Sequence, residues 1–196
     1  MVLLTRVLGR CEDVAQYSRI SRGVLSPHSQ SENEELLKNL FKWEHFSPLE
    51  YLDFTFYVQS SIVAARQLFR HRIGVSPLEQ SLRYVTLDDI KFVYPTKDQE
   101  TVEAMDKAYL YASQAYQSLI NKGVEPEHAR YVLPLGTATQ YYLHLNGRSF
   151  LELYQKRSTD EVQPETRELV QEMMEQLVSR NETNLYARCV KEYCGQ

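Results

Sequence analysis

The stretch RQLFRHRIGVSPLEQSLRY, residues 66–84, holds four arginines and one glutamate in nineteen residues. It therefore carries a net charge of +3 with its histidine counted as neutral, within a chain whose formal net charge is −4. Because a guanidinium fork matches phosphate and carbonyl oxygens, such a cluster favours a binding site for an anionic ligand. The alternative is a solvated basic turn with weak surface ion pairs, and the residues alone leave both interpretations open.

The segment before and within this stretch predicts how its cations are presented. Helical spacing of apolar residues in 60–69 predicts a helix, on which Gln67 and Arg70 share one face. Residues 70–72 then leave the helix end and point in different directions, which suits a junction between two ligands. The glycine and the proline of 73–80 predict a loop.

The rest of the chain alternates irregularly between strand and helix patterns. Strands are predicted at 2–9, 51–60 and 137–146, with one or two more in 81–95. Helices are predicted at 31–44 (capped by Ser31), 98–121, 126–136, 147–157 and 164–180. This order favours an α+β fold over a wound parallel sheet, and the length of 196 residues fits one domain, 1–196.

Composition limits the cellular context and the partners. Hydrophobic residues make up 43% of the chain and charged residues 24%, which is typical of a globular protein. The odd set of cysteines, Cys11, Cys189 and Cys194, favours reduced thiols in a cytoplasmic protein. No signal peptide or membrane-spanning run is recognised, and the acidic balance argues against broad nucleic-acid binding.

Several common catalytic motifs are missing from the sequence. There is no P-loop, no G-x-G-x-x-G, no H-E-x-x-H, no C-x-x-C and no G-x-S-x-G. We therefore expect no metal site and no evident protein nucleophile, which leaves the difficult chemistry to a cofactor.

Five segments then resemble one family, the flavin-dependent thymidylate synthases. RHRIGVSPLEQSLRY (70–84) resembles the family's central signature of Arg-His-Arg, a short loop, and a serine followed closely by Arg-Tyr. HFSPLEYLDFTF (45–56), ARYVLPLG (129–136) and NGRSFLELYQKR (146–157) resemble further segments in the family's order, as does YSRIS (17–21).

The resemblance implies an antiparallel central sheet flanked by helices and a specific reaction. Such enzymes convert dUMP to dTMP, with methylenetetrahydrofolate as carbon donor and NADPH as reductant through FAD. No protein nucleophile attacks the uracil, which agrees with the missing motifs. The resemblance also implies a homotetramer whose active sites lie at subunit interfaces.

The implied roles attach to individual residues. Catalytic roles fall on Ser81, Arg83 and Arg157. Positions that hold dUMP are Gln67, Arg70, Glu79, Ser81, Arg83, Arg130 and Arg157. Positions that hold FAD are Ser21, His45, Ser47, Arg70, His71, Arg72, Ile73, Glu79, Asn146, Arg148 and Glu152.

The chain also departs from the family pattern. The loop between Arg72 and Ser81 is one residue longer than usual, and Leu78 and Leu82 replace polar or small residues. Glu152 stands where an asparagine that contacts flavin is common. These changes leave open a non-catalytic flavin- or nucleotide-binding homologue on the same fold, and an RNA-binding protein is a weaker third hypothesis.

Structural roles also remain open for single residues. These are a turn or cap for His45, Ser47 and Asn146, a helix C-terminus for Arg130 and Arg157, and a surface pair for Arg148 with Glu152.

Overall fold

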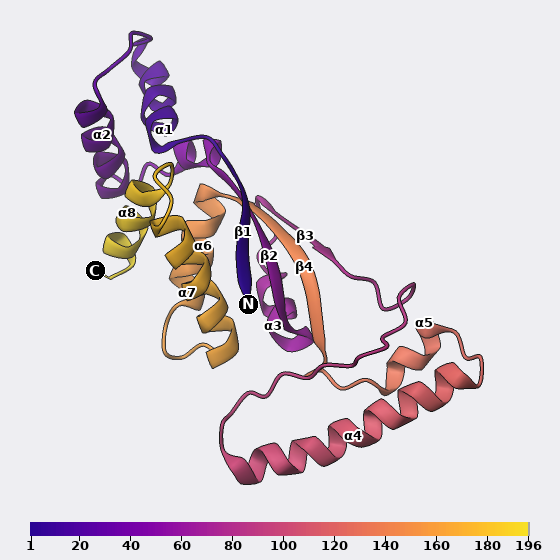
Figure 1. Cartoon of the computed structure of the whole chain (residues 1–196). Coiled ribbons are helices and arrows are strands. Elements are labelled where there is room, and N and C mark those ends of the chain that lie inside the picture. Colours follow the sequence, from indigo (N-terminus) through magenta and orange to yellow (C-terminus); the bar gives the residue numbers. More distant parts are fainter. Residues whose placement is uncertain (196) are drawn as a thin grey trace.

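The computed structural model describes residues 1–195 and confirms the α+β fold, with one antiparallel sheet (Figure 1). The strands are β1 (Val2–Leu8), β2 (Asp53–Ser61), β3 (Val75–Glu79) and β4 (Ala138–Asn146), in the spatial order β1-β2-β4-β3. The alternation of β2 is confirmed, because Phe54, Phe56 and Val58 are fully buried while the residues between them are half-buried.

Helices cover one face of this sheet. The α-helices are α1 (Cys11–Ser18), α2 (Gln30–Lys42), α3 (Ile62–Leu68), α4 (Gln99–Asn121), α5 (Pro126–Ala129), α6 (Gly147–Arg157), α7 (Pro164–Val178) and α8 (Asn184–Cys194). The short 3-10 helices are η1 (Arg19–Arg22), η2 (Ser47–Tyr51) and η3 (Arg130–Val132). Helices α3, α6, α7 and α8 lie on the face that buries the core, and α1 and α2 close one end (Figure 1). No helix within residues 1–195 is long and apolar enough to cross a membrane.

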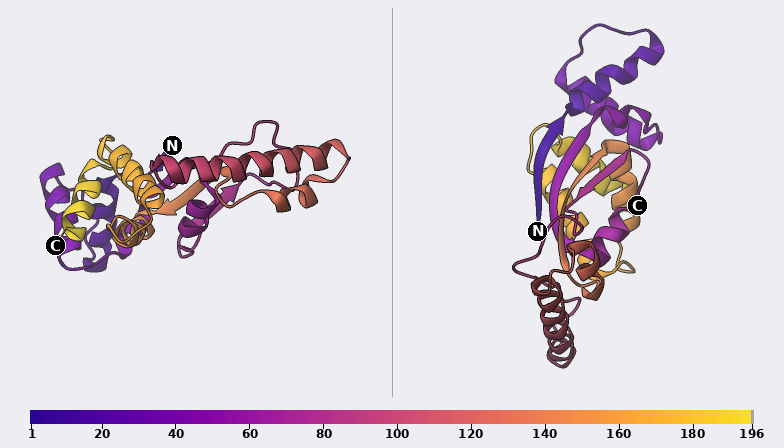
Figure 2. Two further views of the ribbon diagram at one scale, coloured as in Figure 1. Left: turned by 90° about the horizontal axis from the view of Figure 1, so that it is seen from below. Right: turned by 90° about the vertical axis from the view of Figure 1, so that its right-hand side faces the viewer.

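The opposite face of the sheet carries no helix within residues 1–195, as the right-hand view of Figure 2 shows. Leu3 pairs with Tyr57, Tyr57 with Tyr142, and Tyr142 with Leu78, so one row of apolar side chains crosses all four strands. Leu3, Tyr142 and Leu78 are 54%, 47% and 72% exposed. This row, here called the apolar strip, thus crosses the uncovered face in the single chain.

Residues 81–135, here called the arm, extend away from the body formed by 1–80 and 136–195 (Figure 2). The long helix α4 leaves the plane of the body, and only Tyr109 and Tyr116 of its apolar stripe are buried. Leu110 and Tyr111 stay 57% and 72% exposed. The arm therefore holds its shape with few buried side chains.

Two predictions around the basic stretch were wrong. The predicted loop 73–80 contains the edge strand β3, which pairs with β4 from Val75 to Glu79. Glycine and proline signal loops, but an edge strand tolerates proline because one side of its backbone needs no partner. The loop signals therefore concealed a strand.

The strands predicted in 81–95 do not form, apart from one isolated bridge between Phe92 and Thr137. The apolar residues of this segment pack on α4 instead, with the Phe92 ring stacked on Tyr109 at 4.2 Å between centroids. The hydroxyl of Tyr116 also accepts a hydrogen bond from the Leu87 amide at 3.2 Å. A helix that arrives later in the chain therefore satisfies this segment in place of a sheet.

Helix boundaries differ in smaller ways. The cap of α2 is Ser29 rather than Ser31, and Glu32 completes its capping box. Residues 126–136 form only the short α5 and η3 before Pro134. Helices α1 and α8 were not predicted. The predicted span 1–196 includes Gln196, which lies outside the described residues.

Candidate active site

The basic stretch and α6 together line a cavity of about 380 Å³, here called the α3–α6 cavity. It is lined by Arg70, His71, Arg72, Ile73, Val75, Ser149, Glu152, Lys156 and Arg157. Three arginines and one lysine line it against a single glutamate, so the cavity favours an anion. The structure therefore brings together Arg70 to Ile73 with Glu152 and Arg157, which lie about eighty residues later.

Arg157 and His71 are joined directly. The Nε of Arg157 donates to Nε2 of His71 at 3.2 Å, and its terminal nitrogen donates to the Gln67 carbonyl at 3.4 Å. Burial, followed by the nearby charges of Arg157 and Lys156, lowers the pKa of His71. An imidazole whose Nε2 accepts a hydrogen bond carries its proton on Nδ1. His71 is thus a neutral donor beside two fixed cations.

Gly74 sets the path of the loop that follows Arg72. Its φ of +63° is left-handed, and an added Cβ would lie 2.5 Å from Nδ2 of Asn146. Ser149 donates to the Ile73 carbonyl at 2.7 Å, and Asn146 caps α6 by accepting from the Ser149 amide at 2.9 Å. The loop is therefore held against the N-terminus of α6, and the capping alternative considered for Asn146 is confirmed.

Two further predicted residues form side-chain hydrogen bonds with partners that the sequence did not indicate. Gln67 donates to Gln163 at 2.5 Å, and Glu79 accepts from the hydroxyl of Thr139 at 2.8 Å. Glu165 braces the other end of α3, where it accepts from the amide and the hydroxyl of Ser61 at 2.6 Å each. These partners are 60 to 104 residues apart in sequence, so no local signal reveals them.

Three predicted dUMP residues lie apart, on the arm. Arg83 forms an ion pair with Glu127 at 2.6 Å, and Arg130 donates to the carbonyl of the same residue at 3.2 Å. Ser81 accepts from the Arg83 amide at 3.3 Å. Tyr131, beside Arg130, is 83% exposed. This arm cluster is solvent-facing in one chain and is not joined to the α3–α6 cavity.

A larger cavity of about 940 Å³ lies between α1, η1, α2 and η2 and is here called the N-terminal cavity. Three predicted flavin residues, Ser21, His45 and Ser47, line it. So do aromatic residues that the sequence reasoning missed: Tyr17, Trp43 and Tyr51. Tyr17 and Tyr51 belong to the segments 17–21 and 45–56 that resemble the family. They were missed because only the positions that match the family pattern were considered there.

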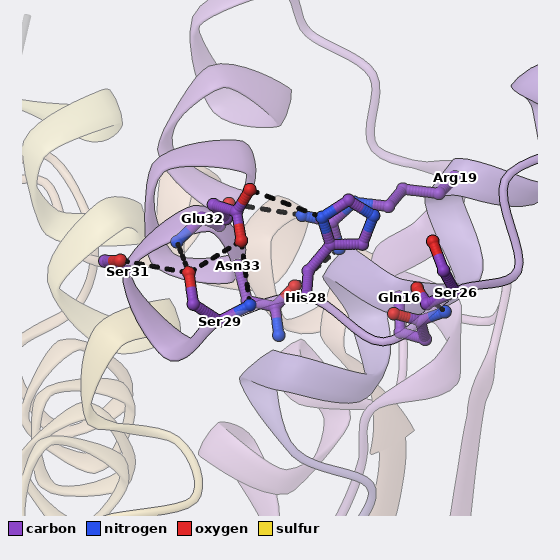
Figure 3. A network of polar contacts seen from close by, with 8 residues as sticks. All are labelled: Gln16, Arg19, Ser26, His28, Ser29, Ser31, Glu32 and Asn33. Atoms are coloured by element: carbon purple, nitrogen blue, oxygen red, sulfur yellow. Dashed lines mark hydrogen bonds and ion pairs between the residues drawn. The ribbon is translucent and has the colours of Figure 1, made fainter.

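Figure 3 shows a polar network that contains three lining residues of the N-terminal cavity, Arg19, His28 and Glu32. Arg19 donates to the side chain of Asn33 at 2.5 Å and to the carbonyl of Glu32 at 3.3 Å. Hydrogen bonds from the side chain and backbone of Ser29, then from His28, lower the pKa of Glu32 to about 2. The network thus fixes the turn at residues 23–29 against α2.

The two cavities flank the N-terminus of α6. Arg148 pairs with Glu50 of the N-terminal cavity at 2.8 Å, while its neighbour Ser149 lines the α3–α6 cavity. The surface pair of Arg148 with Glu152 considered from the spacing does not form. Ser47 begins η2 without a side-chain cap bond, so the capping alternative for it is also wrong.

Comparison with known proteins bears on what this arrangement is for. The family model described as thymidylate synthase complementing protein matches residues 3–180. The chain belongs to this family. The predicted resemblance to flavin-dependent thymidylate synthases is thereby confirmed.

Similar proteins agree with this membership. A flavin-dependent thymidylate synthase of Pyrococcus furiosus is 32% identical over 184 residues, which cover 86% of this chain and 75% of that protein. One from Clostridium tetani is 33% identical over 192 residues, with 86% and 76% covered.

A solved structure shares the fold. The UMP/dUMP methylase PolB from Streptomyces cacaoi, bound with 5-Br dUMP, superimposes with a TM-score of 0.86 at 23% identity, over 98% of this chain and 94% of that one. The fold of this chain is therefore that of a known structure. Most of the predicted residues fall in three groups, the α3–α6 cavity, the N-terminal cavity and the arm, while Gln67, Glu79, Asn146 and Arg148 lie outside them.

Proposed function

We propose that this chain converts dUMP to dTMP, with methylenetetrahydrofolate as the carbon donor and NADPH as the reductant through FAD. Membership of the family makes it a flavin-dependent methyltransferase of the thymidylate synthase type. The observation that carries the finer proposal is the cationic α3–α6 cavity, built from the family signature and closed by Arg157.

The residues present fit FAD. Arg70, Arg72 and Lys156 supply cationic donors for a diphosphate, and the neutral His71 offers its Nδ1–H to a ring carbonyl or nitrogen. On the other side of the α6 N-terminus, the N-terminal cavity offers Trp43 and other aromatic faces on which a planar ring stacks. When bound, FAD supplies the hydride chemistry between NADPH and the transferred methylene carbon.

The chain's own residues bind and polarise the pyrimidine nucleotide in this proposal. Gln67, Arg70 and Glu79 orient it, and the arginines of the arm cluster clamp its phosphate. Arg157 donates to a uracil carbonyl and stabilises the negative charge that develops there. The Streptomyces cacaoi methylase bound with 5-Br dUMP shares this fold, which supports a uracil nucleotide in the site.

The thiols support a mechanism without a protein nucleophile. Burial raises the pKa of Cys11 and of Cys189 to about 11 and also raises that of Cys194. All three are therefore protonated at neutral pH, and a thiol is a far weaker nucleophile than a thiolate.

We further propose a cytoplasmic homotetramer in which each site combines the body of one copy with the arm of another. The separation of the arm cluster from the α3–α6 cavity supports this, because within one chain the arm residues do not lie at the cavity. The apolar strip on the uncovered sheet face and the exposed Leu110 and Tyr111 of α4 offer apolar surface for contacts between copies. We propose that the chain acts as one catalytic domain, which its single buried core supports.

The test is product formation by the purified protein. Flavin retained after removal of excess FAD is measured by visible absorption, and dTMP is then measured with dUMP, methylenetetrahydrofolate and NADPH. UMP is assayed in parallel to define the sugar. Formation of dTMP that needs all components supports the proposal. Flavin and dUMP binding without turnover would instead identify the non-catalytic homologue.

A further inference from the structure

The carboxylate of Glu79 has a buried partner that neither the motif nor the resemblance indicates. We propose that Thr139 is a positioning residue, which holds Glu79 as a fixed acceptor for a hydrogen-bond donor of dUMP. The proposal rests on the proposed function, in which Glu79 contacts this nucleotide. It adds the residue that presents Glu79 and the chemical group that Glu79 recognises.

The geometry of the pair is asymmetric. Thr139 lies on β4 beside Ser60 of β2 and is only 6% exposed, whereas Glu79 ends the edge strand β3 and is exposed. The Thr139 hydroxyl donates to Oε1 of Glu79 at 2.8 Å. The backbone of Glu79 is held as well, because it pairs in register with Tyr141. A rigid, buried donor therefore orients a side chain that would otherwise rotate freely in water.

This arrangement lowers the cost of binding. A glutamate side chain loses rotamer freedom when a ligand fixes it, and a group that is already held loses less. A hydroxyl has a single proton to donate, so Thr139 engages Oε1 and leaves Oε2 for the ligand. Glu79 is thus preorganised with one oxygen directed away from its partner.

The chemistry of dUMP restricts what that oxygen contacts. An ionised carboxylate only accepts hydrogen bonds. The phosphate and the two ring carbonyls of dUMP are also acceptors and are repelled. The hydrogen-bond donors of dUMP are the imide N3–H of uracil and the 3′-hydroxyl of the deoxyribose. Glu79 therefore accepts a hydrogen bond from one of these two groups, and Thr139 orients its carboxylate for that bond.

The experiment measures dUMP affinity of the FAD-loaded assembly by calorimetry. T139V keeps the shape and removes the donor, T139S restores it, and E79Q removes the charge. We expect T139V to weaken dUMP binding about tenfold, T139S to stay within about twofold of the wild type, and T139V to add nothing on the E79Q background.

Thr137 provides a matched control. It is also buried and lies directly before the same strand, but its hydroxyl donates to the Pro134 carbonyl at 2.7 Å. T137V therefore tests the loss of a buried hydroxyl without touching Glu79, and it should leave dUMP affinity unchanged. Unfolding midpoints of both variants separate a general loss of stability from the specific effect.

Two analogues identify the donor. 2′,3′-Dideoxyuridine monophosphate lacks the 3′-hydroxyl, and dCMP has an unprotonated N3. The analogue whose affinity no longer changes between wild type and T139V lacks the group that Glu79 reads, and either result supports the proposal. Equal dUMP affinity of T139V and wild type, failure of T139S to rescue, or additive effects of T139V and E79Q would overturn it. Wild-type protein that binds no dUMP would instead refute the proposed function.

Discussion

The body and the arm are built from the same kinds of amphipathic helix, yet they differ in what covers the apolar faces. In the body, Leu169, Val170 and Met173 of α7 are at most 4% exposed because the sheet and α8 cover them. In the arm, α4 buries only Tyr109 and Tyr116 of its apolar stripe, and Leu110 and Tyr111 beside that stripe remain more than half exposed.

This difference separates folding from assembly. An apolar stripe indicates that a helix face is to be covered but does not say by which chain. The body covers its stripes with its own elements, so its core is complete within one chain. The arm carries Arg83 and Arg130 on a surface that this chain leaves open, which is the arrangement expected when a second copy completes the site.

The sharpest test inactivates the body in one chain and the arm in another by single substitutions. R70A in the body and R83A in the arm should each lower kcat/KM for dUMP by about a thousandfold, because each removes a charge-assisted clamp. Co-refolding the two inactive variants should restore part of the activity, since mixed assemblies contain sites with both arginines intact. The measurement is dTMP formation by the mixture.

The matched control is a mixture of R70A with R157A, both of which alter the α3–α6 cavity of the body. This mixture should stay inactive, because every site receives one damaged body cavity. An R70A and R83A mixture that is no more active than the control would show that one chain supplies both arginines to a site.

Core truncation should distinguish the regions by stability. L177A, at a fully buried position of α7, should lower the free energy of unfolding by about 3 kcal/mol. L110A in the arm should change it by less than about 0.5 kcal/mol but should weaken assembly. Denaturant titration measures the first effect and light scattering the second. The reverse pattern would contradict the division into body and arm.

A smaller effect is expected where α7 braces α3 inside the body. E165Q weakens the charge-assisted bonds to the amide and hydroxyl of Ser61, and it should cost about 1–3 kcal/mol of unfolding free energy. E168Q changes an exposed carboxylate on the same helix and should have almost no effect. Equal losses in both variants would mean that the brace does not stabilise the body.

Replacing two buried threonines of the body by valine should change the free energy of unfolding in opposite directions. Thr166 is fully buried, and its hydroxyl finds no partner in the described part of the chain, so T166V should stabilise the protein by about 0.5–1 kcal/mol. Thr183 is equally buried but donates to the Leu177 carbonyl at 2.7 Å, so T183V should destabilise it by about 1 kcal/mol. Denaturant midpoints compare the pair, and effects of the same sign would argue against the hydrogen-bond explanation.

The last prediction concerns pH. Burial and the charges of Arg157 and Lys156 lower the pKa of His71 from its ordinary 6.5, so the unfolded chain binds its proton more readily. Stability should therefore fall as pH drops below about 6.5. H71Q and R157Q should both reduce the slope of unfolding free energy against pH, measured between pH 8 and pH 5. An unchanged slope in H71Q would assign it to other groups.

The sequence predicted the candidate site better than its surroundings. The resemblance to the family pointed to the signature Arg-His-Arg together with Arg157 and Glu152, and the structure places these residues around one cavity. Thr139 and Gln163 could not be assigned, because they are ordinary polar residues that matter only through partners distant in sequence. The same limit explains the missed strand β3, whose pairing with β4 overrides the local signals of Gly74 and Pro77.

By itself the sequence determined the α+β class, the positions of the main strands and long helices, and the family. These follow from periodicity and motif, which are local properties of the chain. Only the tertiary structure decided that β3 is a strand, that Thr139 holds Glu79, and that Arg83 and Arg130 lie on an arm away from the α3–α6 cavity. Such facts depend on which distant segments meet in space, and the periodicity of a single segment carries no record of its partner.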